Sequence, residues 1–260
     1  MIFLKLGGSL ITDKSQRETA QIGILQRLAK EISEALRAKP EIQLLIGHGS
    51  GSFGHTAAAE FGILDGVKTK EEWRGVREVW AAANRLHRIV MDTLLEAGLP
   101  VFSFPPSAFA ISNHGEIATL PDEPIRRALK AGQIPMVQGD IVFDRGQGAA
   151  ILSTEKVMAR LAKKLRPQRI LLAGIEEGVY ERYPARDRVM PEISADQIED
   201  IQLEGADSTD VTGGMAHKVE QALALAALLP EVEVRIFSGA SPGNLQGALL
   251  GYALGTRVIA

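Results

Sequence analysis

Three glycine turns, each accompanied by a lysine or a histidine, are the parts of this sequence whose residue types and spacing suit chemistry on phosphate groups. They are KLGGSLITDK at 5–14, GHGSGSFGH at 47–55 and DVTGGMAHK at 210–218. Backbone N–H groups at a glycine turn that leads into a helix can point at an anion, and the helix dipole adds to the attraction. We expect all three turns at strand-to-helix junctions, so the sequence predicts a site for a polyphosphate.

The charged side chains of these turns fit phosphoryl transfer, which needs in-line positioning and cations on the developing charge. Three lysines supply positive charge: Lys5, Lys14 and Lys218. His55 closes the second turn and can hold an acceptor phosphate as a hydrogen-bond donor or as a cation. His48 suits a packing role as well as a functional one. His87, His114 and His217 are expected to be structural or exposed.

Several better-known motifs fit this sequence poorly. Gly49, Gly51 and Gly54 have the spacing of the dinucleotide fingerprint, but the chain continues into a helical pattern at 71–98 rather than into a strand with an acidic residue. Protein kinases share this glycine spacing, yet the chain contains neither H-R-D nor D-F-G. It also lacks the G-x-x-x-x-G-K-[ST] pattern of a P-loop.

Composition narrows the class of protein further. The 260 residues are 45% hydrophobic and 23% charged, with a net charge of −3, and no basic stripe suggests a nucleic-acid partner. The absence of cysteine excludes disulfides, thiolate metal sites and thiol catalysis. No apolar run of about 18 residues can span a bilayer, and the N-terminus does not resemble a signal peptide. We therefore expect a cytoplasmic protein without a membrane partner.

The elements that must position the glycine turns alternate along the chain. Strands are expected at 2–6, 42–47, 100–104, 134–144, 168–174, 233–239 and 256–259, and helices at 18–38, 71–98, 123–131, 153–165, 212–229 and 244–251. Apolar strands separated by helices predict a mostly parallel sheet covered on both faces. The candidate domain boundary is the segment KKLRPQR at 163–169, where a helix ends at a proline.

The order of the motifs resembles that of the amino acid kinase superfamily and, more narrowly, of the isopentenyl phosphate kinases. The segments that carry the resemblance extend over nearly the whole chain: KLGGS at 5–9, GHGSGSFGH at 47–55, PPSAF at 105–109, QGDIVFD at 138–144, DVTGGMAHK at 210–218 and FSGASPGNLQGALLGYALGT at 237–256. The S-F-G-H ending of the second turn is the feature that resembles the isopentenyl phosphate kinases in particular. Fosfomycin kinases share it in part.

This resemblance implies a fold, a reaction and an assembly. The implied fold is a three-layer α/β/α sandwich with a mostly parallel central sheet, in which an acceptor lobe at 1–166 holds part of the ATP phosphate site and 167–260 form the nucleotide-binding lobe. The implied reaction is ATP-dependent phosphorylation of isopentenyl phosphate to isopentenyl diphosphate, with Mg²⁺, in a homodimer. Metal-ligand spacing such as H-E-x-x-H is absent, so the metal is expected to arrive with ATP.

Site residues follow from the resemblance by position. Catalytic roles are implied for His55, Lys5 and Lys14. Contacts to ATP are implied for Lys5, Leu6, Gly7, Gly8, Ser9, Gly51, Gly174, Gly214 and Lys218. Contacts to the acceptor are implied for Ser50, Gly54, His55, Thr154, Val76, Val79, Leu86, Ile141 and Ile151. The apolar members of this last set would line a slot for the prenyl chain, although such a stripe also occurs in ordinary cores.

Two segments depart from the usual family pattern. Relatives often carry Ser-Gly-Asp-Asp where this chain has STEK at 153–156, so Glu155 is the expected acid that organises the lysines. Relatives often show Asp-x-Asp-Gly-Val-Tyr where this chain has IEEGVY at 175–180. Two alternatives therefore stay open: a kinase of another small phosphate or phosphonate, such as fosfomycin, and a non-catalytic ligand-binding module on the same fold.

Overall fold

The computed structural model of the chain describes residues 1–54, 66–183, 185–197, 202–203 and 214–260. A large sheet of eight strands lies at its centre, in the order β11-β14-β13-β9-β1-β2-β6-β3. Its pairs are parallel apart from the antiparallel pair of β13 and β14. The strands are β1 (Ile2–Leu6), β2 (Leu44–His48), β3 (Val101–Ser103), β6 (Ile134–Gln138), β9 (Arg169–Gly174), β11 (Glu192–Ile193), β13 (Glu233–Ser238) and β14 (Thr256–Val258).

Helices cover both faces of this sheet, and two apolar cores lie between the layers. One core joins the sheet to α1 (Gly8–Ile11), α2 (Ile22–Ala38), α4 (Lys70–Glu96) and α8 (Asn244–Leu250). The other joins it to α5 (Glu123–Lys130), α6 (Thr154–Leu165) and α7 (Gly214–Leu228). Alternate residues of β1 enter the two cores, because Ile2 and Leu4 face one layer and Phe3 faces the other. The expected three-layer α/β/α sandwich is confirmed.

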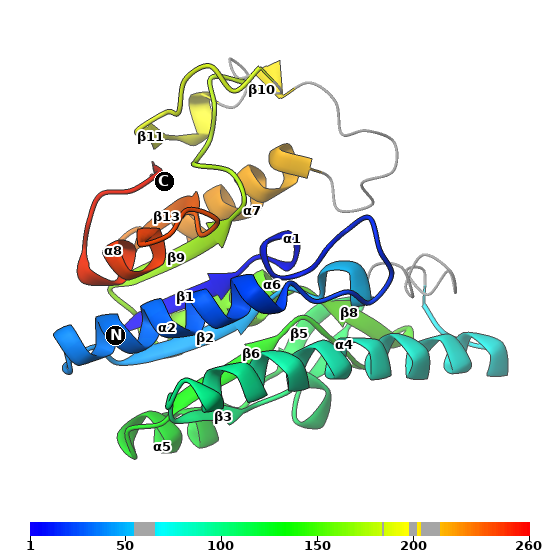
Figure 1. Ribbon diagram of the computed structural model, residues 1–260. Helices are drawn as coiled ribbons and strands as arrows, with labels where there is room; N and C mark the ends of the chain where they lie inside the picture. Colours follow the sequence, from blue (N-terminus) through cyan, green and yellow to red (C-terminus); the bar gives the residue numbers. More distant parts are fainter. Residues whose placement is uncertain (55–65, 184, 198–201, 204–213) are drawn as a thin grey trace.

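Two smaller sheets complete the fold. Four strands in the order β5-β4-β7-β8 form a second sheet: β4 (Ile111–Asn113), β5 (Glu116–Thr119), β7 (Asp140–Asp144) and β8 (Gly148–Leu152). A parallel pair consists of β10 (Arg182–Tyr183) and β12 (Gln202–Leu203), and the single turns η2 (Pro106–Ala108) and η3 (Ala195–Gln197) lie in connections. Figure 1 shows the C-terminal elements, in yellow to red, at one end of the molecule and the green and cyan elements at the other.

Local sequence explains where the main helices begin. Thr69 and Glu72 form a capping box at the start of α4, in which each side chain accepts a hydrogen bond from the other residue's backbone N–H. Ser153 caps α6 and accepts from the Lys156 N–H, as the serine in the sequence predicts. Within the described ranges, none of the helices combines the length and the apolar content that crossing a bilayer requires.

The structure corrects three of the element predictions. The apolar run 134–144 is not one strand, because the chain turns at Gly139 and its two halves, β6 and β7, belong to different sheets. The helix predicted at 18–38 begins only at Ile22, since Ala20 forms an antiparallel bridge with Thr12. The strands β4, β5 and β8 were not expected, and they are only three to five residues long.

Strands from both sides of the predicted domain boundary, between residues 166 and 167, belong to the same sheet. All five residues of β1 pair with β9, from Ile2 opposite Arg169 to Leu6 opposite Ala173. The two halves of the chain are therefore joined by backbone hydrogen bonds along a central strand pair. The division into an acceptor lobe and a nucleotide lobe stays a prediction about function.

Candidate active site

A cavity of about 340 Å³ opens at the carboxyl ends of β1, β2 and β9. Parallel strands place their carboxyl ends at one edge of the sheet, and ligands of open α/β sheets bind there. The walls include the residues that follow β1 and β2, the start of α6 and one turn of α7. The sheet thus brings together glycine turns that are far apart in the sequence.

The first two glycine turns pack backbone against backbone. A Cβ atom at Gly8 would lie 2.5 Å from the backbone nitrogen of Gly51, closer than any side chain tolerates. Gly51 also has a φ of +50°, a conformation that glycine adopts without strain. Glycine at both positions therefore allows the two loops to form one continuous wall of backbone amides. Residues 51–54 are helical, as the strand–turn–helix pattern predicts.

Lys5 and Glu155 form an ion pair in the wall of the cavity. Lys5 is the last residue but one of β1 and Glu155 is the second residue of α6, and only 14% and 19% of their side chains are exposed. Burial raises the pKa of Glu155, but the charge of Lys5 and its hydrogen bond outweigh this effect, so the pKa lies below its usual value. Glu155 therefore carries a negative charge at neutral pH and pairs with the Lys5 ammonium group, and its role as a lysine-organising acid stays a prediction.

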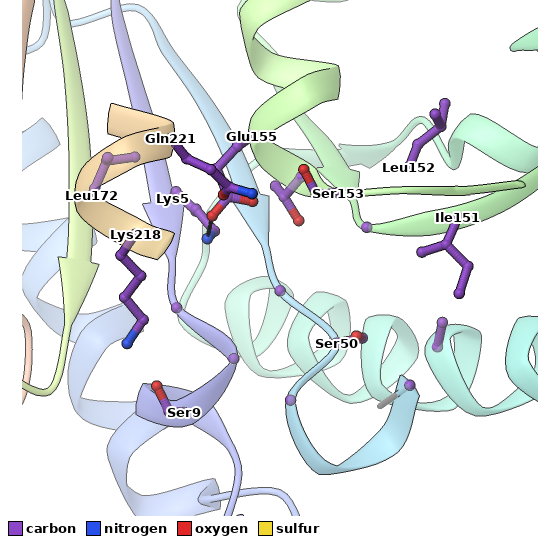
Figure 2. Close-up of a pocket in the computed structure, with 18 of the residues that line it drawn as sticks. Lys5, Ser9, Ser50, Ile151, Leu152, Ser153, Glu155, Leu172, Lys218 and Gln221 are labelled. Carbon is purple, nitrogen blue, oxygen red and sulfur yellow. Dashed lines mark hydrogen bonds and ion pairs between the residues drawn. The ribbon is translucent and has the colours of Figure 1, made fainter. Parts of the chain in front are cut away.

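Two further lysines line the same cavity. Lys14 reaches it from the segment after α1, and Lys218 reaches it from the second turn of α7. Figure 2 shows the Lys218 side chain extending from α7 on the side of the cavity where Ser9 lies. The cavity therefore collects three cations from three separate segments, which suits the charge of a triphosphate.

The opposite part of the cavity is apolar. Val79 and Ala83 of α4 face Ile141 of β7 together with Ile151 and Leu152 of β8. Val79 and Ile141 of this wall also pack with Val67 and Ala149 in a small separate core. Figure 2 shows Ile151 and Leu152 well apart from Lys5 and Lys218, with Ser50 between the two groups. One cavity thus joins a cationic end to an apolar end.

Most of the predicted site residues lie on the cavity wall. The following residues line it: Lys5, Gly7, Gly8, Ser9, Lys14, Ser50, Gly51, Gly54, Val79, Ile141, Ile151, Thr154, Glu155, Gly174 and Lys218. The Thr154 hydroxyl donates to the His48 carbonyl oxygen at 2.7 Å, so it also ties α6 to the end of β2.

The remaining predicted residues are placed differently. Leu6 is fully buried, and its carbonyl oxygen accepts from the Gly49 N–H at 3.0 Å. Leu86 belongs to the main core, and Val76 packs behind the apolar wall rather than on it. Gly214 begins α7, four residues before Lys218. His55 lies outside the described residues, so its predicted role stays a prediction.

Sequence reasoning missed several residues of the wall. They are Gly49, Ala83, Gly139, Asp140, Leu152, Ser153, Leu172, Ala173, His217, Gln221 and Ile236. Asp140 is a buried carboxylate that accepts from the backbone N–H groups of Ser107 at 3.0 Å and Ile141 at 2.9 Å. Burial raises its pKa, and these hydrogen bonds only partly oppose the shift. Its place inside the motif QGDIVFD was the available signal.

This combination of fold and cavity defines a class of protein. A three-layer sandwich that holds cations and backbone amides against an apolar pocket suits a kinase whose small acceptor has an apolar part.

The amino acid kinase family model matches residues 1–238 of the chain. The isopentenyl phosphate kinase of Methanothermobacter thermautotrophicus is 38% identical, over 99% of this chain and 98% of the relative. That of Methanocaldococcus jannaschii is 32% identical, with the same coverage. A solved isopentenyl phosphate kinase structure is 34% identical and has a TM-score of 0.84 over 99% of both chains. This chain belongs to the amino acid kinase family and, within it, to the isopentenyl phosphate kinases.

Proposed function

We propose that this protein transfers the γ-phosphoryl group of ATP to isopentenyl phosphate, giving ADP and isopentenyl diphosphate. The observation that carries the proposal is the single cavity that is lined by Lys5, Lys14 and Lys218 and also by an apolar wall with Val79 and Ile151. The lysines suit two phosphate-bearing molecules, and the apolar wall suits a five-carbon chain. The relatives named isopentenyl phosphate kinase, which match over nearly the full length, support the same assignment.

The proposed reaction needs little covalent chemistry from the protein. A phosphate oxygen of the acceptor attacks the γ-phosphorus while the bond to the β–γ bridging oxygen breaks, and that electron pair leaves with ADP. The attacking oxygen is already anionic near neutral pH, so no strong general base is required. The protein's task is to hold two anions in line and to neutralise the charge that spreads over the moving group.

Each charged residue has a proposed part in this task. Lys218 binds the triphosphate together with the amides that follow β1. Lys5 and Lys14 contact the moving phosphoryl group, and Glu155 keeps Lys5 in position. His55 binds the phosphate of the acceptor.

Magnesium fits this site as a companion of the nucleotide. In the described part of the chain, no group of three or more histidine and acidic side chains is arranged to hold a metal ion. The two carboxylates on the wall, Glu155 and Asp140, already accept hydrogen bonds from protein groups. We propose that Mg²⁺ would enter with ATP and would neutralise part of the charge of its phosphate groups.

We also propose that the protein is a homodimer and that it is cytoplasmic. Phe102 on the edge strand β3 is 56% exposed, and Leu95 near the end of α4 is 46% exposed. Exposed apolar side chains of this kind suit a surface that a second copy covers.

An acceptor panel tests the proposed function. The purified protein, ATP and MgCl₂ are incubated with isopentenyl phosphate, fosfomycin or no acceptor, and ADP release is measured. We expect release above the no-acceptor background with isopentenyl phosphate. Release with fosfomycin alone would instead identify the second candidate function. ATP binding without release for any acceptor would support the non-catalytic module.

A further inference from the structure

A buried histidine pair connects the second glycine turn to the elements behind it. His48 ends β2 and His87 lies on α4, and these residues are only 1% and 5% exposed. His48 Nε2 lies 2.8 Å from His87 Nδ1, and the ring centroids are 5.1 Å apart with planes inclined by 21°. Because the nitrogen atoms are so much closer than the centroids, the rings meet edge to edge, as a hydrogen bond between them requires.

Each ring has a second partner that extends the pair into a chain. His48 Nδ1 lies 3.1 Å from the carbonyl oxygen of Gly49. His87 Nε2 lies 2.7 Å from the hydroxyl oxygen of Ser103 at the end of β3. Three hydrogen bonds therefore join four groups one after another: Ser103 of β3, His87 of α4, His48 of β2 and the Gly49 carbonyl of the glycine turn.

Only one arrangement of protons satisfies this chain when both rings are neutral. A carbonyl oxygen can only accept, so His48 donates from Nδ1 to Gly49. Its Nε2 must then accept, which requires His87 to donate from Nδ1. The remaining nitrogen of His87 accepts from the Ser103 hydroxyl. All three hydrogen bonds therefore point in one direction, from β3 toward the glycine turn.

The surroundings keep both rings neutral. Burial lowers the pKa of His48 to about 4, although the hydrogen bond to Gly49 opposes the shift. The pKa of His87 is lowered to about 3, mainly by burial and also by the neighbouring His48 and the Arg88 cation. The one-directional arrangement is therefore the state of the chain near pH 7.

The last hydrogen bond fixes a peptide group of the cavity wall. In a trans peptide the carbonyl group and the next N–H point in opposite directions. Holding the Gly49 carbonyl against the buried ring therefore turns the Ser50 N–H away from it, and both residues line the cavity. Among the hydrogen bonds of the described residues, none is donated by the Ser50 N–H.

Glycine at position 49 makes such a restraint necessary. A Cβ atom there would lie 2.9 Å from the backbone nitrogen of Gly8, so a larger residue would separate the two loops. Glycine permits many backbone conformations, and the Gly49–Ser50 peptide can rotate unless something outside it holds the carbonyl. The His48 ring is the group in place to do so.

We propose that Ser103, His87 and His48 are positioning residues that orient the Ser50 N–H toward the phosphate of the acceptor. The identity of that acceptor rests on the proposed function, whereas the hydrogen-bond chain does not depend on it. Neither histidine lies on the cavity wall, so both act through the peptide group and not on the reacting atoms.

The first test reads the proton positions in the unmodified protein. Nitrogen-15 NMR of histidine-labelled protein near pH 7 distinguishes a protonated ring nitrogen from an unprotonated one. We expect both His48 and His87 to carry the proton on Nδ1. A proton on Nε2 of His48 would contradict the chain, because its Nδ1 would then be unable to donate to Gly49.

The second test separates positioning from folding. His87→Ala removes the donor to His48, whereas His87→Asn places an amide N–H near the position of Nδ1. We expect His87→Ala to lower kcat/KM for isopentenyl phosphate roughly tenfold or more, through a higher KM for the acceptor and with the KM for ATP unchanged. His87→Asn should recover most of this loss. The matched control is His114→Asn, at an exposed turn outside the cavity, which should behave as wild type.

Two results would overturn the proposal. One is a folded His87→Ala protein with wild-type kcat/KM. The other is a lower kcat with both KM values unchanged, since that pattern reports only a smaller fraction of active enzyme. Failure of the proposed function would look different: the wild type would not turn over isopentenyl phosphate, while the NMR result would still decide the chain.

Discussion

At the scale of single residues, the contact between Glu155 and Lys5 gives the most direct prediction. Glu155→Gln removes the charge that holds Lys5 but keeps an oxygen that can accept a hydrogen bond. We expect kcat to fall by about tenfold, the loss expected when a charge-assisted hydrogen bond is weakened. Steady-state kinetics at saturating ATP and acceptor measures this change.

A control for this substitution involves the residue that follows Glu155 in the sequence. Glu116 forms an ion pair with the exposed Lys156, the residue after Glu155, at 2.7 Å. Because exposed pairs contribute little, Glu116→Gln should leave kcat and stability nearly unchanged. Equal kcat values for Glu155→Gln and the wild type would remove Glu155 from its assigned role.

Val79 gives a second residue-scale prediction, on the length of the acceptor. Val79→Ala should deepen the apolar end of the cavity, because Val79 lies on its wall with Ile141 and Ile151. Each additional methylene that finds apolar room is worth about 0.8 kcal/mol, roughly fourfold in affinity. The ratio of kcat/KM for a C10 prenyl phosphate to that for isopentenyl phosphate should therefore rise.

Leu86 provides the matched control on the same helix. It lies seven residues beyond Val79, about 10.5 Å further along the axis, and is fully buried in the main core. Leu86→Ala should lower the free energy of unfolding by roughly 2–5 kcal/mol and leave the acceptor ratio unchanged. A ratio that moves with Leu86 and not with Val79 would place the slot elsewhere.

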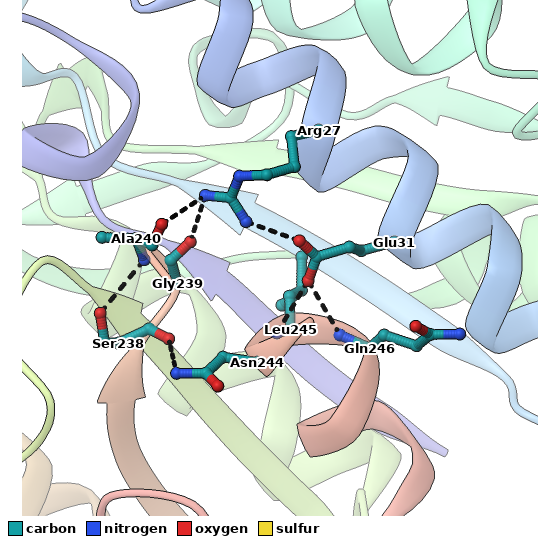
Figure 3. A network of polar contacts seen from close by, with 8 residues as sticks. All are labelled: Arg27, Glu31, Ser238, Gly239, Ala240, Asn244, Leu245 and Gln246. Atoms are coloured by element: carbon teal, nitrogen blue, oxygen red, sulfur yellow. Dashed lines mark hydrogen bonds and ion pairs between the residues drawn. The ribbon is translucent and has the colours of Figure 1, made fainter. Parts of the chain in front are cut away.

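At the scale of elements, a buried carboxylate fastens α2 to the C-terminal segment. Glu31 is 5% exposed and accepts from the backbone N–H groups of Leu245 at 3.0 Å and Gln246 at 3.2 Å, at the start of α8. Arg27 donates to Glu31 and to the carbonyl oxygens of Gly239 and Ala240 (Figure 3). This network spans more than 200 residues of sequence and joins α2 to the loop that follows β13.

Removal of this carboxylate should destabilise the fold without a direct effect on chemistry. Glu31→Ala leaves two backbone donors without a partner and removes the carboxylate that pairs with Arg27, so we expect the free energy of unfolding to fall by about 1–3 kcal/mol. Urea denaturation measures this change. Glu34→Ala, one turn further along α2, removes only a longer 3.8 Å contact with exposed Lys30 and should change stability by about 0.5 kcal/mol or less. Equal losses in both variants would contradict the assigned role of Glu31.

The sequence predicted the elements that carry the cationic end of the cavity. Glycine turns after β1 and β2 are visible as local patterns, and the parallel sheet brings their strand ends to one edge. The residues that were missed carry no such pattern. Ala83, Leu172 and Ile236 are ordinary apolar residues of helices and strands, and only their orientation in the assembled fold places them on the wall.

The short strands were missed for a related reason. An apolar run shows that a segment is buried but not which sheet it joins, so 134–144 looked like one strand. Gly139 is the only mark of the turn, and its N–H donates to the His48 carbonyl oxygen at 3.2 Å. His87, the partner of His48, was expected to be structural or exposed, and nothing in the spacing of the two residues predicted their contact.

At the scale of the whole molecule, the buried histidines predict how stability depends on pH. Unfolding exposes both rings and returns their pKa values to about 6.5. Since the folded values are about 4 and about 3, the unfolded chain binds more protons as the pH falls below 6.5. Stability is therefore fully present above pH 6.5 and decreases as the pH falls toward 4, by up to about 1.4 kcal/mol per pH unit for each ring.

Urea denaturation between pH 7 and 5 measures this slope in a range where most carboxylates stay ionised. His87→Asn removes one of the two rings, so the slope should be smaller in this variant than in the wild type. The difference between the two proteins isolates the histidine contribution from that of other groups. Identical slopes would show that His87 is not held neutral in the folded state.

The central claim is that this protein moves a phosphoryl group from ATP to the phosphate of isopentenyl phosphate. Phosphorus-31 NMR of the reaction of purified protein with ATP, MgCl₂ and isopentenyl phosphate tests it most directly, because the spectrum identifies the product as well as the loss of ATP. The account predicts that isopentenyl diphosphate and ADP appear in equal amounts, and that the rate is much lower with Lys5→Ala. ATP consumption without the paired signals of a diphosphate, or no reaction with isopentenyl phosphate while fosfomycin is phosphorylated, would contradict the account.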